Sequence, residues 1–355
     1  MYRHADVCSA SKLGDMMRRA FLIGGVIACV GCNPGPPPDV NMGAFLPGPP
    51  ETEGGSAAFE PDAVTTPPPT AGQNFFPYGL TYATAGLTIS RGFPFPGEDG
   101  LTNYVWETES WNTIATTVCG PGAIAIGDPK MVVGGEYIPS LSAYPVYAVF
   151  GSLLAGLFLY RTGFQGDLLE GAQCVRLPGS SIPGVLTDQP TVSWLPAVGG
   201  QESPRLAVVF IGGQDVWPDT DHTLATLKLN AFSGDMEPES VTYETLPDPL
   251  SPAANTDFGD CSVPVGGRSE RGRGSIVASA SGDLFHAYTN YLDDTQPTAS
   301  PPVPRRVYVE KLSAPRWSIC LDDFGADGIV ASQNYFDLGD PDIAFDGTTG
   351  SLLAT

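Results

Sequence analysis

The chain has 355 residues, of which 43 are glycine and 35 are proline, so these two types make up about 22% of the sequence. That is roughly twice their ordinary share and argues against a compact helical bundle. Acidic residues outnumber basic ones by 39 to 17, which gives a net charge of −22. Contacts with nucleic-acid phosphates need clustered lysine and arginine, so no nucleic-acid partner is expected. With 42% hydrophobic residues, the chain can still bury a sizeable core.

Residues 1–31 have the character of an export signal. Two arginines, Arg18 and Arg19, precede an apolar run from residue 20 to residue 30, and Gly31 and Cys32 follow it. A positive segment, a short apolar segment and small residues before a break are typical of a secretory signal peptide. The apolar run is too short to span a membrane as a mature helix. Export is therefore predicted.

The break falls at a cysteine, and the segment resembles the signal of bacterial lipoproteins, in which that cysteine is acylated and becomes the first mature residue. Cys32 is the favoured site because a proline-rich stretch starts directly after it, whereas residues 26–29 (VIAC) fit the usual lipobox better and make Cys29 the alternative. The resemblance implies a palmitate-type anchor, a membrane partner through it, and a location at the outer membrane or cell surface. Residues before Met16 carry no signal character, so Met16 and Met17 are alternative start sites.

Residues 32–74 are predicted to be a disordered tether. Between residues 34 and 70 there are eleven prolines and five acidic residues but no lysine or arginine. Such a composition buries too little apolar surface to offset the entropy of ordering. Without the signal, the mature chain has 37 acidic and 13 basic residues, a net charge of −24. Such a surface repels anionic membranes and nucleic acids.

From residue 75 to residue 355 the chain consists of short apolar runs separated by Gly, Pro, Asp and Ser, which predicts an all-β domain. The segment 151–155 (GSLLA) recurs at 350–354, and looser copies surround three further glycines. The five turn glycines, at 86, 151, 213, 282 and 350, lie 62 to 69 residues apart. Glycine is expected there because tight hairpins require positive φ, and the flanking runs are expected to be the two central strands of a small sheet.

A small sheet that recurs about every 65 residues resembles a β-propeller with long outer loops. The alternative is a pair of tandem β-sandwiches. Residues 306–312 alternate as an outer strand does, and residues 317–321 are expected to pair beside them. Because the fifth repeat stops after its first hairpin, the propeller is expected to be incomplete, with the natural product continuing beyond Thr355.

One uncharged stretch, residues 137–160, approaches the length of a membrane helix. It is interrupted by Pro139, Pro145, Gly151 and Gly156 and contains one of the repeated hairpins. Two buried strands are therefore predicted there instead of a membrane span.

Four cysteines remain in the mature domain: Cys119, Cys174, Cys261 and Cys320. An even number in an exported chain predicts disulfides, and of the three connectivities sequential pairing is preferred because each loop then spans about one repeat. A zinc site is disfavoured because no Cys-x-x-Cys spacing remains. Asp323 and Asp327 lie in a sequence similar to half of a calcium loop and are the candidates for structural Ca²⁺, with an ordinary Asp-rich turn as the alternative. No other cofactor is expected.

The function predicted from these features is a binding or scaffold module at the cell envelope, with a glycan or an envelope protein as its ligand. The alternative is an exo-acting polysaccharide hydrolase or lyase on a propeller scaffold. No catalytic residue is assigned, because no Gly-x-Ser-x-Gly elbow is present and the many acidic residues make any carboxylate pair unspecific. Residues 90–94 (SRGFP) match the arginine motif of propeller sialidases too poorly to take over its role. A deep pocket with converging Arg, Tyr and acidic side chains would favour the enzyme.

Overall fold

The computed structural model describes residues 59–67, 76–83, 86–96, 102–120, 123, 129–152, 156–178, 188–198, 203–211, 222–246, 269–292, 306–320, 342–346 and 351–354. Contacts divide the chain into Met1–Met42 and Gly43–Thr355, and every described residue belongs to the second unit. The predicted signal lies outside the described residues, as do the candidate site residues Cys29, Cys32, Cys261, Asp323 and Asp327.

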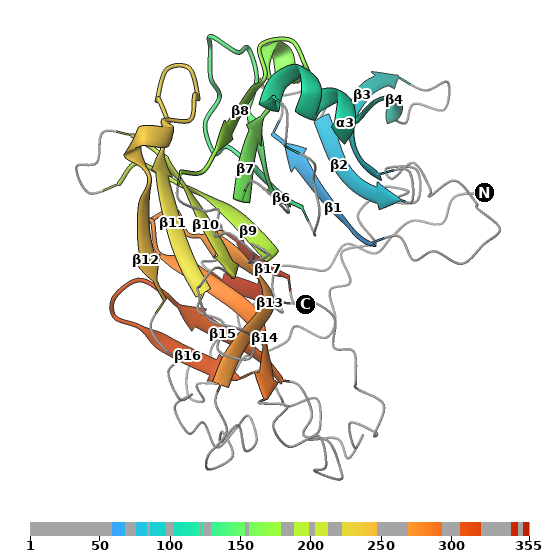
Figure 1. Cartoon of the computed structure of the whole chain (residues 1–355). Helices are drawn as coiled ribbons and strands as arrows, with labels where there is room; N and C mark the ends of the chain where they lie inside the picture. The colour runs from blue at the N-terminus through green and yellow to red at the C-terminus, as the bar shows by residue number, and fades with distance from the viewer. Residues whose placement is uncertain are drawn as a thin grey trace, which may run out of the picture. The chain divides into compact units, whose positions relative to one another are not determined.

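The described strands form five antiparallel sheets, in which strands adjacent in the chain are adjacent in the sheet (Figure 1). Sheet 1 contains β1 (Phe59–Thr66), β2 (Phe76–Ala83), β3 (Gly86–Pro96) and β4 (Thr102–Ser110). Sheet 2 contains β5 (Lys130–Val133), β6 (Val146–Ser152), β7 (Gly156–Arg161) and β8 (Gln173–Arg176). Sheet 3 contains β9 (Asp188–Leu195), β10 (Arg205–Ile211), β11 (His222–Lys228) and β12 (Thr242–Thr245). Sheet 4 contains β13 (Ser269–Ala278), β14 (Leu284–Leu292), β15 (Arg306–Lys311) and β16 (Trp317–Cys320), and sheet 5 contains β17 (Ile343–Asp346) and β18 (Ser351–Ala354).

Helical structure in the described residues is limited to four short segments: α3 (Trp111–Ile114), η2 (Ala115–Cys119), η3 (Phe164–Gly166) and η4 (Pro238–Ser240). The all-β prediction is thereby confirmed. So is the pairing of residues 306–311 with residues 317–320, since β15 lies between β14 and β16.

The uncharged stretch 137–160 forms strands, as predicted, because β6 and β7 lie within it. All six residues of β7 are buried. Phe158 and Tyr160 pack into a core shared with sheet 1, whereas Leu157 and Leu159 pack into a core shared with sheet 3. A strand covered on both faces reads as a continuous apolar run, which explains its likeness to a membrane segment. Among the described residues no helix is long and apolar enough to cross a membrane.

Apolar side chains fill the space between each sheet and the next along the chain. The first core joins sheets 1 and 2, and the second joins sheets 2 and 3. A third core includes Leu195 and Ala207 of sheet 3 with Ile276 and Leu284 of sheet 4. A further cluster packs sheet 4 against Ile343 of sheet 5. Burial of apolar area of this kind contributes about 25 cal/mol for each Å², so the sheets stabilise one another in chain order.

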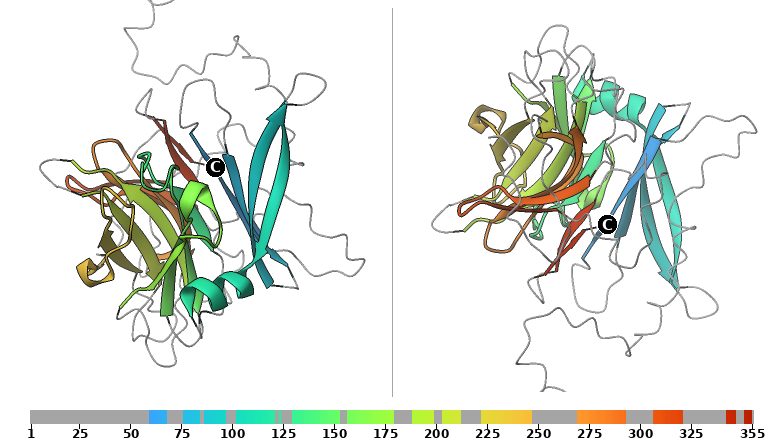
Figure 2. Two further views of the ribbon diagram at one scale, coloured as in Figure 1. Left: turned by 90° about the horizontal axis from the view of Figure 1, so that it is seen from above. Right: turned by 90° about the horizontal axis from the view of Figure 1, so that it is seen from below.

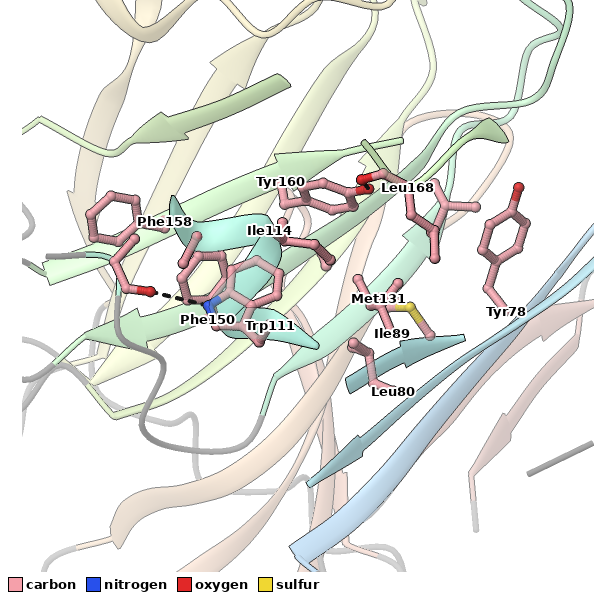
Figure 3. Close-up of a cluster of buried hydrophobic side chains, with 14 residues drawn as sticks. Tyr78, Leu80, Ile89, Trp111, Ile114, Met131, Phe150, Phe158, Tyr160 and Leu168 are labelled. Atoms are coloured by element: carbon pink, nitrogen blue, oxygen red, sulfur yellow. Dashed lines mark hydrogen bonds between the residues drawn. The ribbon is translucent and has the colours of Figure 1, made fainter. Parts of the chain in front are cut away.

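Trp111 anchors the segment that follows sheet 1 (Figure 3). Ser110 caps this segment by accepting a hydrogen bond from the backbone N–H of Thr113. The Trp111 ring lies edge-on to Phe150 with centroids 3.9 Å apart, and its Nε1 donates to the carbonyl of Ala123 over 3.1 Å. A buried indole N–H needs such a partner, so the Ala123 carbonyl fixes how the ring is seated.

A disulfide joins the end of η2 to β8. Cys119 is bonded to Cys174, with their Cα atoms 4.8 Å apart and a separation of 55 residues in the chain. The first half of the preferred sequential pairing is confirmed. Cys320 ends β16, and its pairing with Cys261 stays a prediction.

The tether prediction was wrong at its C-terminal end, since Phe59–Thr66 within residues 32–74 form β1. β1 pairs with β2, and these two strands are seen side by side, in blue, in both views of Figure 2. Positions 64–66 hold three β-branched residues, which favour a strand, but the high proline content around them predicted disorder instead. Pro61 is tolerated because β1 is an edge strand whose register is irregular between Phe59 and Asp62.

Of the five predicted turn glycines, Gly213 and Gly350 lie outside the described residues, and the other three do not occupy equivalent places. Gly282 has a φ of 81° in the turn between β13 and β14, as expected for a hairpin, whereas Gly151 lies within β6 and Gly156 supplies the positive φ of 86°. Gly86 and Gly151 belong to hairpins of second and third strands, but the Gly282 hairpin joins the first and second strands of its sheet. An apolar run, a glycine and another apolar run look alike at any turn of a meander. The described residues show no closed ring of sheets and do not confirm a repeat.

Replacing Cys119 and Cys174 together by alanine is expected to lower the free energy of unfolding by about 4 kcal/mol, from the loop-closure entropy that a bridge of this span removes from the unfolded chain. Urea unfolding of the variant and the wild type without reductant measures the difference. Dithiothreitol should lower the unfolding midpoint of the wild type more than that of the variant. Equal stability of the two proteins would show that this bridge is not closed in solution.

Candidate functional site

A pocket of about 580 Å³ lies between sheet 1 and the turn that follows β7. β3 and β4 supply one wall, in which Arg91 lies opposite Glu107 and Phe93 lies opposite Val105. Since side chains two apart on a strand share a face, these four residues form one surface. Its volume is in the range that small-molecule sites occupy.

Arg91 is the cation of this wall, and only 6% of it is exposed. Its Nη2 donates to the carbonyl of Gln165, and its guanidinium lies 4.2 Å from the ring centroid of Phe93. The rings of Phe76 and Tyr78 follow at 5.5 and 6.0 Å. Among the described residues Arg91 makes no ion pair with a carboxylate, and its buried Nε has no hydrogen-bond partner. Aromatic faces and one carbonyl therefore stabilise a charge that most buried arginines share with an acid.

The opposite wall is the turn around η3, which two hydrogen bonds hold against sheet 1. One is the bond from Arg91 to Gln165, and the other runs from the Tyr78 hydroxyl to the carbonyl of Gly166 over 3.2 Å. Gln165 adopts a φ of 52°, which costs a residue with a side chain of order 1 kcal/mol. A Cβ on Gly166 would lie 2.1 Å from the Tyr78 hydroxyl oxygen, so only glycine fits there.

Three carboxylates border the same pocket: Glu107, Asp167 and Glu170. Asp167 is fixed because its Oδ1 accepts hydrogen bonds from the backbone N–H groups of Leu169 and Glu170 over 2.8 and 2.7 Å. Burial raises the pKa of the Glu107 carboxyl, Asp167 raises this pKa further, and Arg91 partly offsets both effects. With one cation and three acids, the lining has a formal charge of −2.

Aromatic surface completes the lining, from Phe93 and Phe164. Phe164 is 50% exposed and Val105 is 59% exposed, so apolar surface faces solvent beside the charged groups. The site thus offers arginine donors, carboxylate acceptors and flat apolar faces together. A polar, uncharged ligand with several hydroxyl groups uses all three, whereas a phosphate or sulfate would meet the three carboxylates.

A second polar cluster lies between sheets 3 and 4 and is buried except for Arg316, whose side chain is 23% exposed. His286 Nδ1 is 3.3 Å from one carboxylate oxygen of Glu310, and Arg316 Nη2 is 3.4 Å from the other. The His222 and His286 rings lie 6.2 Å apart, and these two histidines and Glu310 are at most 4% exposed. The described residues contain no group of three His, Cys, Asp or Glu that could hold a metal ion. We assign this cluster to cross-linking of the strands.

Few of the residues singled out from the sequence reach the pocket. Cys119 and Cys174 lie in the core beside it, and His222 and His286 are buried far along the chain from β3. Arg91 was noticed only as a poor match to another motif. A usable signal was present, because Arg91, Phe93 and Phe95 alternate along one strand face, where a lone cation among aromatic residues is unusual.

Comparisons of the chain with protein families, with curated proteins and with solved structures find no match. The assignment of function therefore depends on the chemistry of the pocket.

Tyr78 gives the pocket wall a dependence on alkaline pH. Burial raises the pKa of Tyr78 from its ordinary value of 10.0 to about 12, against an opposing effect of Arg91. Between these values the unfolded chain has lost the proton and the folded chain has kept it, so stability falls as pH rises, by about 1.4 kcal/mol from Tyr78 at pH 11. Tyr78→Phe is expected to be less stable than the wild type at pH 9 but to lose less stability between pH 9 and pH 11. Urea unfolding at both pH values tests this, and equal losses would contradict it.

Proposed function

We propose that this protein is an exported, lipid-anchored binding module of the cell envelope and that its pocket between β3, β4 and the η3 turn binds a glycan. The observation that carries the proposal is the buried Arg91, which lines the pocket and makes no direct ion pair with a carboxylate among the described residues. Desolvating an arginine is costly, so a pocket that contains one is expected to use its donors on a ligand. The rigid turn opposite it supports a preformed site.

The combination of groups favours a neutral saccharide. Hydroxyl groups accept hydrogen bonds from Arg91 and donate them to Glu107 and Asp167, and the C–H faces of a sugar ring pack on exposed rings such as Phe164. The net charge of −22 for the chain opposes nucleic acids and anionic polymers. An envelope protein is the other ligand class that the sequence suggested, and it lacks a specific observation in its favour.

We further propose that the five sheets are blades of a β-propeller. Two observations support this reading: four sheets are four-stranded meanders, and each sheet shares an apolar core with the next. The first strands of the sheets begin at residues 59, 130, 188, 269 and 343. An anchor at Cys32 and a proline-rich tether would attach this domain to a membrane.

A second candidate function is hydrolysis of a polysaccharide. The observation that favours it is Glu107, whose pKa is raised by burial and by the neighbouring Asp167. Glycosidases use a carboxyl group with a raised pKa, placed near a second carboxylate, to protonate the leaving group. Arg91 lines the same pocket, and the ring of Tyr78 lies beside Arg91. Release of reducing ends during incubation with a bound glycan would identify the protein as a hydrolase.

Glu107→Gln is expected to weaken glycan binding about tenfold, because it removes a charged acceptor from the pocket. Glu109→Gln is the matched control, since Glu109 lies two residues further along β4 and does not line the pocket. Calorimetric titration of the purified domain with neutral oligosaccharides, selected on a glycan array, measures both. If no glycan binds the wild type, or if both variants bind like the wild type, the pocket is not a glycan site.

Cys32→Ser is expected to release the full-length protein from the membrane fraction and to abolish labelling by a palmitate analogue, because the lipid chains are the predicted attachment. Cys29→Ser is the control at the alternative position and should leave the protein in the membrane. Cell fractionation followed by blotting reads out both variants. Labelling that survives Cys32→Ser but is lost in Cys29→Ser would move the anchor to Cys29.

A further inference from the structure

Phe232 is the most exposed large apolar side chain among the described residues, with 85% of its surface open to solvent. It lies in the connection between β11 and β12, and its backbone is held on both sides. Its N–H donates to the Asn230 side chain over 2.9 Å, and its carbonyl accepts from the Ser140 hydroxyl over 2.8 Å. The N–H of Gly234 returns to the carbonyl of Asn230 over 2.8 Å. An exposed ring is thus presented on an ordered loop.

Side chains of sheet 2 hold this loop in place. The hydroxyl of Tyr147 donates to the carbonyl of Gly234 over 2.9 Å. Arg161, which is 3% exposed, donates from Nη1 to the carbonyl of Ser233 over 3.2 Å, and its Nη2 is 3.2 Å from Oδ1 of Asp235. The buried Arg161 therefore fixes the loop that carries Phe232 to sheet 2.

The guanidinium of Arg161 also contacts the loop that carries Phe164 of the pocket lining. Nη2 of Arg161 also donates to the carbonyl of Gly171 over 3.0 Å. The ring of Phe164 lies directly on Gly171, since a Cβ there would be 2.5 Å from the ring. Phe164 lines the pocket and is half exposed. One side chain therefore connects the loops that carry Phe164 and Phe232.

A third loop belongs to the same unit. The N–H of Gln165 donates to the carbonyl of Leu141 over 2.6 Å, and Ser140, one residue before, holds Phe232. The loop 134–145 thus lies between the pocket turn and the Phe232 loop. The backbone of this rim is ordered before any ligand arrives, so a ligand that spans it does not have to order the loops.

We propose that the ligand is a neutral polysaccharide chain that extends from the pocket over Phe164 to Phe232, with Phe232 as an outer stacking platform. This inference rests on the proposed glycan-binding function. Continuity of the rim with the pocket and the exposed faces of the two rings support it, and the carboxylates of Asp235 and Glu170 along the rim oppose an anionic polymer. A protein segment docked on Phe232 is the competing occupant.

Chain length is the variable that tests the inference. Cello-, xylo-, malto- and chito-oligosaccharides of two and six residues are titrated into the wild-type domain, into Phe232→Ala and into Trp317→Ala. Trp317 is a matched control because it is also a partly exposed ring, at 36%, on sheet 4. Circular dichroism confirms that each variant is folded.

In the wild type, one series is expected to bind about tenfold more tightly as the hexasaccharide than as the disaccharide. Phe232→Ala should lose most of that gain and leave disaccharide binding unchanged, and Trp317→Ala should behave like the wild type. If a disaccharide binds but the hexasaccharide gains nothing, or if Phe232→Ala keeps the gain, the extended site is overturned and the pocket remains. If no oligosaccharide binds the wild type, the proposed function fails as well.

Discussion

The contact of each sheet with the sheet that follows it is the constraint on which the rest of the structure depends. Sheet 2 shows it best, because β7 has no face toward solvent and alternates between two cores. A central strand of this kind is stable only while both neighbouring sheets are in place. The pocket depends on the same contact, since one wall belongs to sheet 1 and the other to a turn of sheet 2.

Next to the pocket, hydrogen bonds from polar side chains help to hold sheet 1 against sheet 2, whereas apolar side chains do this elsewhere. Arg91 and Tyr78 reach from sheet 1 to two successive carbonyls of the turn, and Gln165 takes an unfavourable backbone conformation between them. The desolvation of Arg91 is offset by aromatic rings and a carbonyl, and in the described part of the chain its guanidinium makes no direct ion pair with a carboxylate. Arg91 thus both holds the turn against sheet 1 and lines the pocket.

Part of this could be predicted from the sequence. The alternation and turn residues predicted the strands, including the two in the apolar stretch 137–160, and the cysteine count together with loop length predicted the bond between Cys119 and Cys174. These features are local or follow from chain topology. The glycine pattern did not identify equivalent turns at Gly86, Gly151 and Gly282, because hairpins at different places in a meander share one sequence signal. The prolines around β1 conceal its strand signal.

The site could not be predicted in the same way. Arg91 meets Gln165 across 74 residues and Tyr78 meets Gly166 across 88, so no local pattern links them. Nor does the sequence indicate that Phe232 is exposed and held, because its partners come from loops of another sheet. Both the pocket and the exposed position of Phe232 depend on contacts between distant segments, which form only when the sheets pack together.

The order of strands in every described sheet follows the chain, and this has a consequence for how the pocket forms. Hydrogen bonds within a sheet join neighbours in the chain, so each sheet is assembled from contacts of low sequence separation, which form quickly. The bonds from Arg91 and Tyr78 to the turn close much longer loops and can form only when two finished sheets meet. During refolding, the circular-dichroism signal of the strands is therefore expected to appear before the pocket forms, and the interval between the two measures the docking of sheet 2 on sheet 1.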